Sequence, residues 1–188
     1  FHGGTVSRLT TPVIRRRSAN ISSTLQRSAL PEALKKIYAG RGISDPADLT
    51  LTLDQLLPPL TLKGIGEAAE LLADAIEGEA RVLVVGDFDA DGATSCAMAV
   101  SVLRQIGLKE VAYLVPNRFE FGYGLTPEIV ELAAAQMPDL IVTVDNGISS
   151  IEGVSAAQAL GISVLVTDHH LPAETLPTAD VIVNPNQP

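Results

Sequence analysis

The amino-acid sequence predicts an α/β fold, a doubly wound parallel sheet preceded by a small helical segment. Short aliphatic runs alternate with helical segments from residue 81 to the end of the 188-residue chain. Strands and helices that alternate at this spacing form right-handed βαβ units and a parallel sheet. The chain is also 46% hydrophobic but only 4% aromatic, and aliphatic strands are typical of parallel sheets covered by helices on both faces.

Residues 1–30 are expected to form a flexible basic arm. Residues 1–31 contain five arginines and no acidic residue. The arm resembles an organellar transit peptide in composition, but it lacks a sustained amphipathic helical period. The net charge of the whole chain is −9, which argues against a protein that coats nucleic acid through bulk electrostatics.

A helical segment is predicted over residues 31–80. Pro31 fits the first turn of a short helix that Gly40 can end. Prolines interrupt the stretch 45–60, so only brief helical turns fit there. Residues 64–79, "GIGEAAELLADAIEGE", carry apolar side chains at helical spacing and predict a longer helix.

The α/β domain is predicted over residues 81–188. Its expected strands are the aliphatic runs at 82–86, 111–115, 140–144, 163–167 and 181–185. Its expected helices are the segments 94–107, 126–136 and 150–161. The single cysteine, Cys96, excludes an internal disulfide and suits a reducing cytosol. No apolar run approaches the length of a membrane span, so we expect a cytoplasmic protein with no membrane contact.

Acidic residues and histidines gather at the carboxyl ends of three predicted strands. They are Asp87, Asp89, Asp91, Asp145, Asp168, His169 and His170. Because open α/β sheets bind ligands outside the carboxyl ends of their strands, we expect these side chains to converge on one site.

This set of donors predicts a manganese or magnesium site. Carboxylates held close together repel one another unless a cation or protons intervene. Oxygen and imidazole ligands without thiolate suit manganese, with magnesium possible, whereas structural zinc favours fewer ligands and often sulfur. The set is large enough for two ions that share a carboxylate, an arrangement that serves in-line displacement at a phosphoryl centre.

Other interpretations of the same residues exist. The alternating aspartates fit the start of an EF-hand loop, but the twelfth position from Asp87 is Met98 rather than Glu. A polar turn after a strand is the plain structural alternative, and the paired histidines could likewise lie in a surface turn. An aspartyl-nucleophile phosphatase would need Thr where Ala93 stands and would give His169 and His170 no role.

The stretch "PNRFEFGYGLTPE" is a candidate substrate-binding loop, with Asn117, Arg118 and Tyr123 as its candidate contacts. Arg118 can pair with a phosphate, and Tyr123 and the two nearby phenylalanines can stack on bases. An ordinary loop, fixed by its aromatic residues before a helix that begins at Thr126, remains the alternative.

Four motifs, "VVGDFDADGATS", "LVPNRFEFGYGL", "IVTVDNGIS" and "VTDHHLP", resemble the successive motifs of the DHH phosphoesterase superfamily. They are most similar to those of its bacterial single-strand-specific exonucleases, and the resemblance covers about residues 30–188. It implies a phosphodiesterase that uses two manganese or magnesium ions and hydrolyses single-stranded DNA from the 5′ end in DNA repair and recombination. Other DNA-repair proteins are further candidate partners. A DHH-type phosphoesterase of small nucleotides and a non-catalytic replication scaffold remain alternatives.

The resemblance also implies roles for single residues. Asp89 and Asp91 would each ligate one ion, and Asp145 would bridge the two. His169 would ligate, and His170 would contact the scissile phosphate.

Two further residues take their implied roles from the same comparison. Asp168 would orient the histidines. The pyrophosphatase branch has a His where this chain has Val85, so Asp87 is the expected substitute ligand, and this departure favours the nuclease branch.

Proteins that resemble this one carry a further Asp and a second domain beyond the DHH motif, whereas this chain ends at Pro188. We therefore expect an α/β domain that is incomplete at its C-terminal end. As it stands, it should fold but bind at most one ion tightly and show little nuclease activity.

Overall fold

The structure, a computed structural model, describes residues 18–187. The chain divides into two compact units between Leu56 and Leu57. The predicted arm lies mostly outside the described residues, including Arg8, Arg15, Arg16 and Arg17. The domain boundaries expected after residues 30 and 80 stay a prediction. No helix in the described part is long and apolar enough to cross a bilayer.

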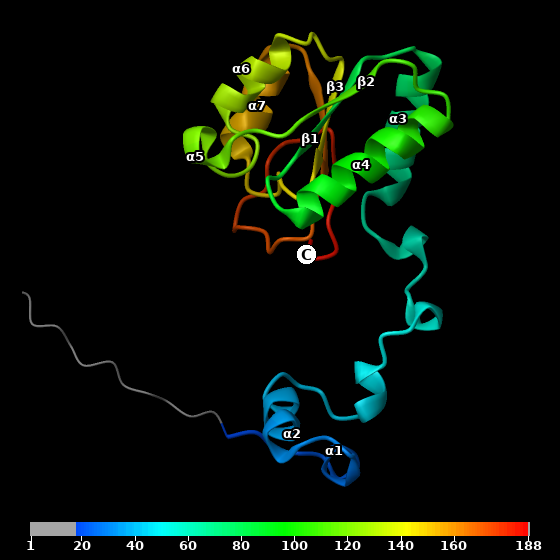
Figure 1. The fold of residues 1–188 in the computed structure, drawn as a ribbon, viewed down its shortest axis with the longest axis vertical. Helices are drawn as coiled ribbons and strands as arrows, with labels where there is room; N and C mark the ends of the chain where they lie inside the picture. Colours follow the sequence, from blue (N-terminus) through cyan, green and yellow to red (C-terminus); the bar gives the residue numbers. More distant parts are fainter. Residues whose placement is uncertain (1–17, 188) are drawn as a thin grey trace, which may run out of the picture. The chain divides into compact units, whose positions relative to one another are not determined.

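The first unit is helical in its described part. It contains α1 (Ser23–Arg27), α2 (Glu32–Ala39) and the 3₁₀ turns η1 (Pro46–Leu49) and η2 (Leu53–Gln55) (Figure 1). Helix α2 follows Pro31 and ends at Gly40, which confirms the short helix predicted there. The 3₁₀ turns confirm the brief helical turns expected in the proline-interrupted stretch.

The second unit contains the sheet. Its elements are η3 (Pro59–Thr61), α3 (Ile65–Glu77), β1 (Val82–Gly86), α4 (Ala90–Gln105), β2 (Val111–Leu114), α5 (Arg118–Phe121), α6 (Pro127–Ala134), β3 (Leu140–Val144), α7 (Ile151–Ala159), β4 (Ser163–Thr167) and β5 (Val181–Val183). The strand order is β2-β1-β3-β4-β5, and every neighbouring pair is parallel. The predicted doubly wound parallel sheet is therefore confirmed.

Helices cover both faces of this sheet, and each face has its own apolar cluster. Successive side chains of a strand point to opposite faces, so Val82 and Val84 of β1 join the cluster under α3 and α4. Leu83 and Val85 join the cluster under α6 and α7. Figure 1 shows these two helical pairs on opposite sides of the strands. Every residue of β1 and β3 is buried, which explains why these strands are continuous aliphatic runs rather than alternating ones.

The register of the strands aligns the residues that follow them. Gly86 pairs with Val144, Val144 with Thr167, and Thr167 with Val183. The next residue on each strand is polar and at most 9% exposed: Asp87, Asp145, Asp168 and Asn184. The strand order changes direction at β1, which has β2 on one side and β3 on the other. Such a switch point is where open α/β sheets bind ligands.

Helix α4 begins earlier than expected, at Ala90 rather than near residue 94. Asp89 accepts hydrogen bonds at the N-terminus of this helix, so a capped helix start occupies the place of the polar turn that was the structural alternative. Gly92 makes the close approach possible, since a Cβ there would lie 2.3 Å from the backbone oxygen of Asp87. The sequence of α4 thus brings a helix N-terminus directly against the end of β1.

Candidate metal centre at the carboxyl ends of the strands

A first group of possible ligands joins the ends of β1 and β3. Asp87, Asp89 and Asp145 each offer a carboxylate oxygen, and these atoms lie within 4.8 Å of one another. Asp89 accepts hydrogen bonds from the backbone N–H groups of Gly92 and Asp91, both at 3.1 Å. The bond from Gly92 is the main reason that the pKa of Asp89 lies below its ordinary value. Asp89 is therefore held as a carboxylate in a fixed orientation.

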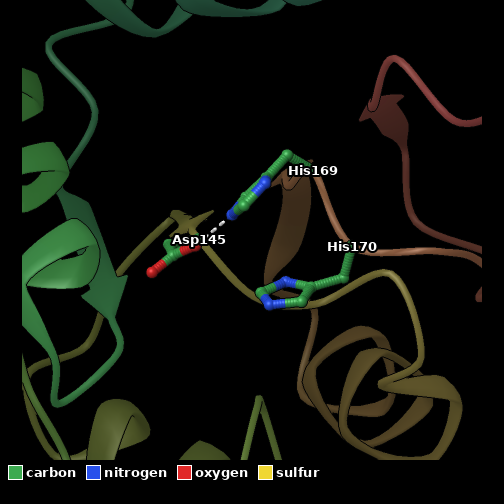
Figure 2. Close-up of side chains that lie close together, drawn as sticks. All are labelled: Asp145, His169 and His170. Carbon is green, nitrogen blue, oxygen red and sulfur yellow. Dashed lines mark hydrogen bonds and ion pairs between the residues drawn. The ribbon is translucent and has the colours of Figure 1, made fainter. Parts of the chain in front are cut away.

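A second group joins the ends of β3 and β4. Asp145, His169 and His170 offer ligand atoms that also lie within 4.8 Å of one another, and Figure 2 shows the three side chains together. His169 Nε2 lies 2.9 Å from Asp145 Oδ1. Asp145 belongs to both groups, so two cations could lie on either side of one carboxylate.

Asp145 has an unusual environment for a charged residue. Its φ of 63° lies in the left-handed region, which non-glycine residues seldom adopt and which is enriched at functional sites. Burial raises the pKa of its carboxyl group, and the hydrogen bond from His169 only partly opposes this. A cation beside Asp145 would favour the ionised form.

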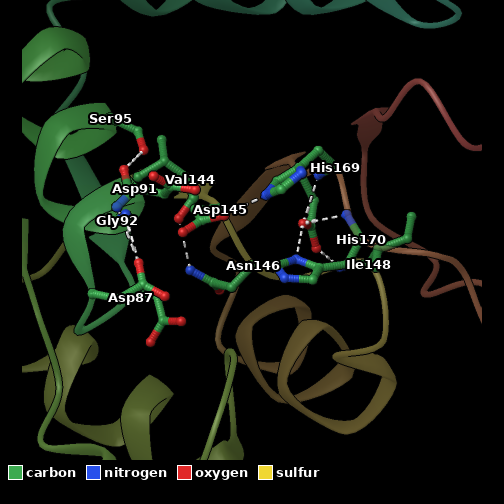
Figure 3. Close-up of polar contacts among 12 residues, drawn as sticks. Asp87, Asp91, Gly92, Ser95, Val144, Asp145, Asn146, Ile148, His169 and His170 are labelled. Atoms are coloured by element: carbon green, nitrogen blue, oxygen red, sulfur yellow. Dashed lines mark hydrogen bonds and ion pairs between the residues drawn. The ribbon is translucent and has the colours of Figure 1, made fainter. Parts of the chain in front are cut away.

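Asp168 organises three residues around it, Ile148, His169 and His170, which are labelled in Figure 3. Its Oδ2 accepts the backbone N–H of Ile148 at 2.9 Å. Its Oδ1 accepts the backbone N–H groups of His169 and His170 at 2.7 and 3.1 Å, and lies 2.7 Å from His170 Nδ1. Burial acts to raise the pKa of Asp168, but the hydrogen bonds from Ile148, His170 and His169 together lower it. This geometry fits the orienting role that the family resemblance implies.

His170 uses Nδ1 within the protein. The hydrogen bond with Asp168 is the main reason that the pKa of His170 is raised. The hydroxyl of Tyr123 lies 3.0 Å from the same nitrogen and donates to the backbone oxygen of Asp145 at 3.2 Å. His170 Nε2 is therefore the ring nitrogen left for a ligand or a substrate.

Tyr123 thus contacts the centre itself. Burial, followed by the charges of Asp168, Asp87 and Asp145, raises the pKa of its hydroxyl, so Tyr123 stays a neutral donor. The guanidinium of Arg118 lies 5.3 Å from the centre of its ring, within the range of a cation–π contact. These contacts point to a positioning role in addition to the predicted base contact.

Arg118 forms an ion pair with Asp87 and lies 3.8 Å from Asp89. It supplies a positive charge beside the first group of carboxylates. Asn117 Oδ1 accepts the backbone N–H of Phe119 at 3.1 Å and so caps α5. Phe121 packs against the apolar cluster under α6 and α7. These two contacts fit the alternative of a loop fixed before a helix, and the contact of the loop with substrate stays a prediction.

Asp91 lies in the first turn of α4, and neither group of close ligand atoms includes it. It lines a cleft of about 490 Å³ together with Asp145 and His169. The structure thus places Asp91 beside the centre but outside both groups of close ligand atoms.

Sequence reasoning missed two asparagines at this edge. Asn146 is 1% exposed, and its Nδ2 donates to the backbone oxygens of Val85 and Val144 at 3.1 and 3.0 Å, which ties β1 to β3. Asn184 donates to the backbone oxygen of His170 at 3.0 Å. The position of Asn184 directly after the fifth aliphatic run was the signal that could have found it.

The chain is similar to known proteins over most of its length. Residues 81–188 match the DHH family, N-terminal domain. The single-stranded-DNA-specific exonuclease RecJ of Salmonella typhimurium is 51% identical over 173 residues, which cover 92% of this chain and 30% of that protein. The protein of the same name from Escherichia coli is 50% identical over an equal span. The chain therefore spans about 30% of the length of these relatives.

A solved structure also matches this fold. The crystal structure of exonuclease RecJ bound to manganese is 40% identical, with a TM-score of 0.63, over 69% of this chain and 33% of that one.

Proposed function

The chain belongs to the DHH family, whose N-terminal domain is formed by residues 81–188, and from this premise we propose that the protein is a metal-dependent phosphodiesterase that hydrolyses single-stranded DNA from the 5′ end. The substrate is supported by the relatives named single-stranded-DNA-specific exonuclease RecJ. The direction is supported by the resemblance of the four motifs to exonucleases that work from the 5′ end.

The proposal rests mainly on Asp145, which belongs to both groups of close ligand atoms. Carboxylate and imidazole donors fit manganese or magnesium, and the manganese-bound RecJ structure supports manganese. Two such ions, when bound, provide a more acidic water and neutralise charge on the attacking and leaving oxygens of a phosphodiester. Asp87 and Asp89 would hold one ion, His169 the other, and Asp145 both.

The remaining residues would bind and orient the substrate. Because Asp168 raises the pKa of His170, the imidazolium form persists to higher pH and can donate from Nε2 to a phosphoryl oxygen. Arg118 neutralises Asp87 in this structure. A divalent cation on Asp87 would take over that charge balance and leave the guanidinium for a phosphate of the strand.

The cellular setting follows from the substrate. Single-stranded DNA arises in the bacterial cytoplasm during repair and recombination, and we place the activity there. Other repair proteins that expose or protect the strand are the partners expected of such an enzyme.

Labelled strands test the proposal. Full-length protein with manganese should release a 5′ label at once as a mononucleotide, whereas a 3′ label should remain on shortening strands. Release of the 3′ label first would contradict the direction. Cleavage of dinucleotides with no cleavage of longer strands would favour a phosphoesterase of small nucleotides. Tight binding of the strand without hydrolysis would favour the scaffold.

A further inference from the structure

Two exposed aromatic rings meet beside the candidate metal centre. Phe88 is 55% exposed and Phe119 is 88% exposed. Their ring centres lie 6.1 Å apart with an interplanar angle of 81°, an edge-to-face contact. The pair joins the loop after β1 to helix α5, which are 31 residues apart in the chain.

The backbone on both sides of this pair is held by polar contacts. Phe88 directly follows Asp87 and donates its backbone N–H to Asp87 Oδ1 at 2.6 Å. Phe119 directly follows Arg118 and donates its backbone N–H to Asn117 Oδ1 at 3.1 Å. Asp87 and Arg118 form an ion pair, so each ring directly follows one member of that pair in the chain.

Helix α5 has one aromatic side chain that packs against the apolar core and one that is exposed. Phe121 packs against the apolar cluster under α6 and α7, whereas Phe119, two residues earlier, is almost fully exposed. Phe119 therefore contributes little to the stability of the fold through burial. An exposed Phe in a fixed position, beside a second exposed Phe, is the arrangement expected of a surface that binds a flat apolar ligand.

We propose that Phe88 and Phe119 form a stacking platform for one base of the single strand whose phosphate is bound at Arg118 and the metal centre. This inference rests on the proposed function. Every nucleobase has a π-face, and stacking on aromatic side chains is tolerant of sequence. A neutral ring pair also attracts a base without adding charge to a centre that must accept cations. The rings thus contact the base, while Arg118 and the metal centre contact the phosphate.

The test is a binding measurement on full-length protein with manganese. The probe is a 5′-phosphorylated strand whose first linkages are phosphorothioates that resist hydrolysis, with a dye at the 3′ end. Phe119→Ala should raise Kd about tenfold, the effect of losing one base–aromatic stack. Phe88→Ala should also weaken binding, and Phe119→Trp should restore it. Tyr113→Ala is the matched control, because Tyr113 is 64% exposed on β2 and should leave Kd unchanged.

Salt dependence and abasic strands separate stacking from other causes. Phe119→Ala should leave the slope of log Kd against log salt unchanged, whereas Arg118→Ala should lower it by about 0.7. One abasic position in the strand should weaken wild-type binding about tenfold but should not weaken Phe119→Ala further, because the two losses remove the same contact.

The outcomes distinguish this inference from the proposed function. A wild-type protein that binds the strand while Phe119→Ala binds it equally well would overturn the platform alone. The platform would also be overturned if the loss of binding free energy in Phe119→Ala added fully to the loss caused by an abasic site at every position of the strand. No base would then be coupled to the ring. A wild-type protein that binds no single strand would overturn the proposed function, and the platform with it.

Discussion

Asp145 combines burial, a left-handed backbone and membership of both groups of possible ligands. Its neighbours hold it in this conformation: Thr143 Oγ1 donates to the backbone oxygen of Asn146 at 2.7 Å, and Asn146 ties the adjacent strand ends together. A carboxylate that is difficult to bury and difficult to orient is therefore supported from several sides. This is the pattern expected where function requires strain.

Asp145→Asn should abolish hydrolysis without unfolding the protein. Asn tolerates the left-handed region as Asp does, and the change removes a charge whose burial is unfavourable. We expect turnover to fall more than about 100-fold, at least as much as for loss of a residue that supports a metal ligand. The metal-free melting temperature should be unchanged or higher. Asp74→Asn, at an exposed position of α3, is the control. Retention of a substantial fraction of wild-type turnover in manganese would show that Asp145 is not shared.

Asp168→Asn should lower both stability and the pKa of His170. Because the folded pKa of Asp168 is lowered, its contribution to stability is present above the unfolded pKa and is lost as pH falls through the folded pKa. Replacement should therefore cost about 3 kcal/mol at pH 7, and the difference from wild type should shrink in strong acid. Urea unfolding at several pH values measures the first effect.

An NMR titration of the metal-free protein measures the effect on His170. Asp180→Asn is the control, because Asp180 accepts the backbone N–H of Val164 at 2.7 Å, at a position away from the histidines. A His170 pKa that is equally high in Asp168→Asn would contradict the assigned cause.

The contacts of Tyr123 show why part of the site could not be predicted. The strand-end rule found Asp87, Asp145 and Asp168, because each follows an aliphatic run and parallel strands end at one edge. No periodicity predicts that the Tyr123 hydroxyl reaches the Asp145 backbone and a histidine 47 residues away. Such contacts depend on the path of the loop between strands, which local sequence does not determine.

Among the elements, the five strands were predicted because each is an aliphatic run, and β1 and β3 are buried along their whole length. The start of α4 at Ala90 was not predicted. Asp and Gly in "DADG" are typical of turns, yet Asp89 caps a helix here and Gly92 allows that helix to lie against Asp87. Tertiary packing decided between two local structures that the same residues permit.

The close approach of α4 to β1 can be tested with two glycines. Gly92→Ala should destabilise the protein by about 2 kcal/mol or more, since the added Cβ would meet backbone at 2.3 Å and overpacking typically costs about 1–3 kcal/mol. Gly66→Ala, in α3, has no atom within 4 Å of its Cβ and should stabilise by about 0.5 kcal/mol. Chemical denaturation of both variants measures the contrast. Equal effects of the same sign would contradict the proposed packing.

In the whole molecule, the carboxylates of the candidate metal centre and the net charge of −9 both lower the stability of the metal-free fold. Burial raises the pKa of Asp145, so ionising this group costs stability as pH rises through the range between its unfolded and folded pKa values. A bound cation reverses that effect.

Manganese should therefore raise the melting temperature. At a free concentration of about 100 times Kd, binding contributes about 2.7 kcal/mol, which corresponds to roughly 5–10 °C for a chain of this size. Asp145→Asn should lose most of this shift, and Asp74→Asn should keep it. A shift that is equal in Asp145→Asn and wild type would place the ion elsewhere.

Anomalous diffraction from crystals of the full-length protein soaked in manganese would show whether Asp145 is shared by two ions. We expect two manganese peaks on either side of the Asp145 carboxylate, one in contact with Asp87 and Asp89 and the other in contact with His169. Manganese peaks that leave Asp145 without a contact, or a single peak that touches only one of the two groups, would contradict this expectation.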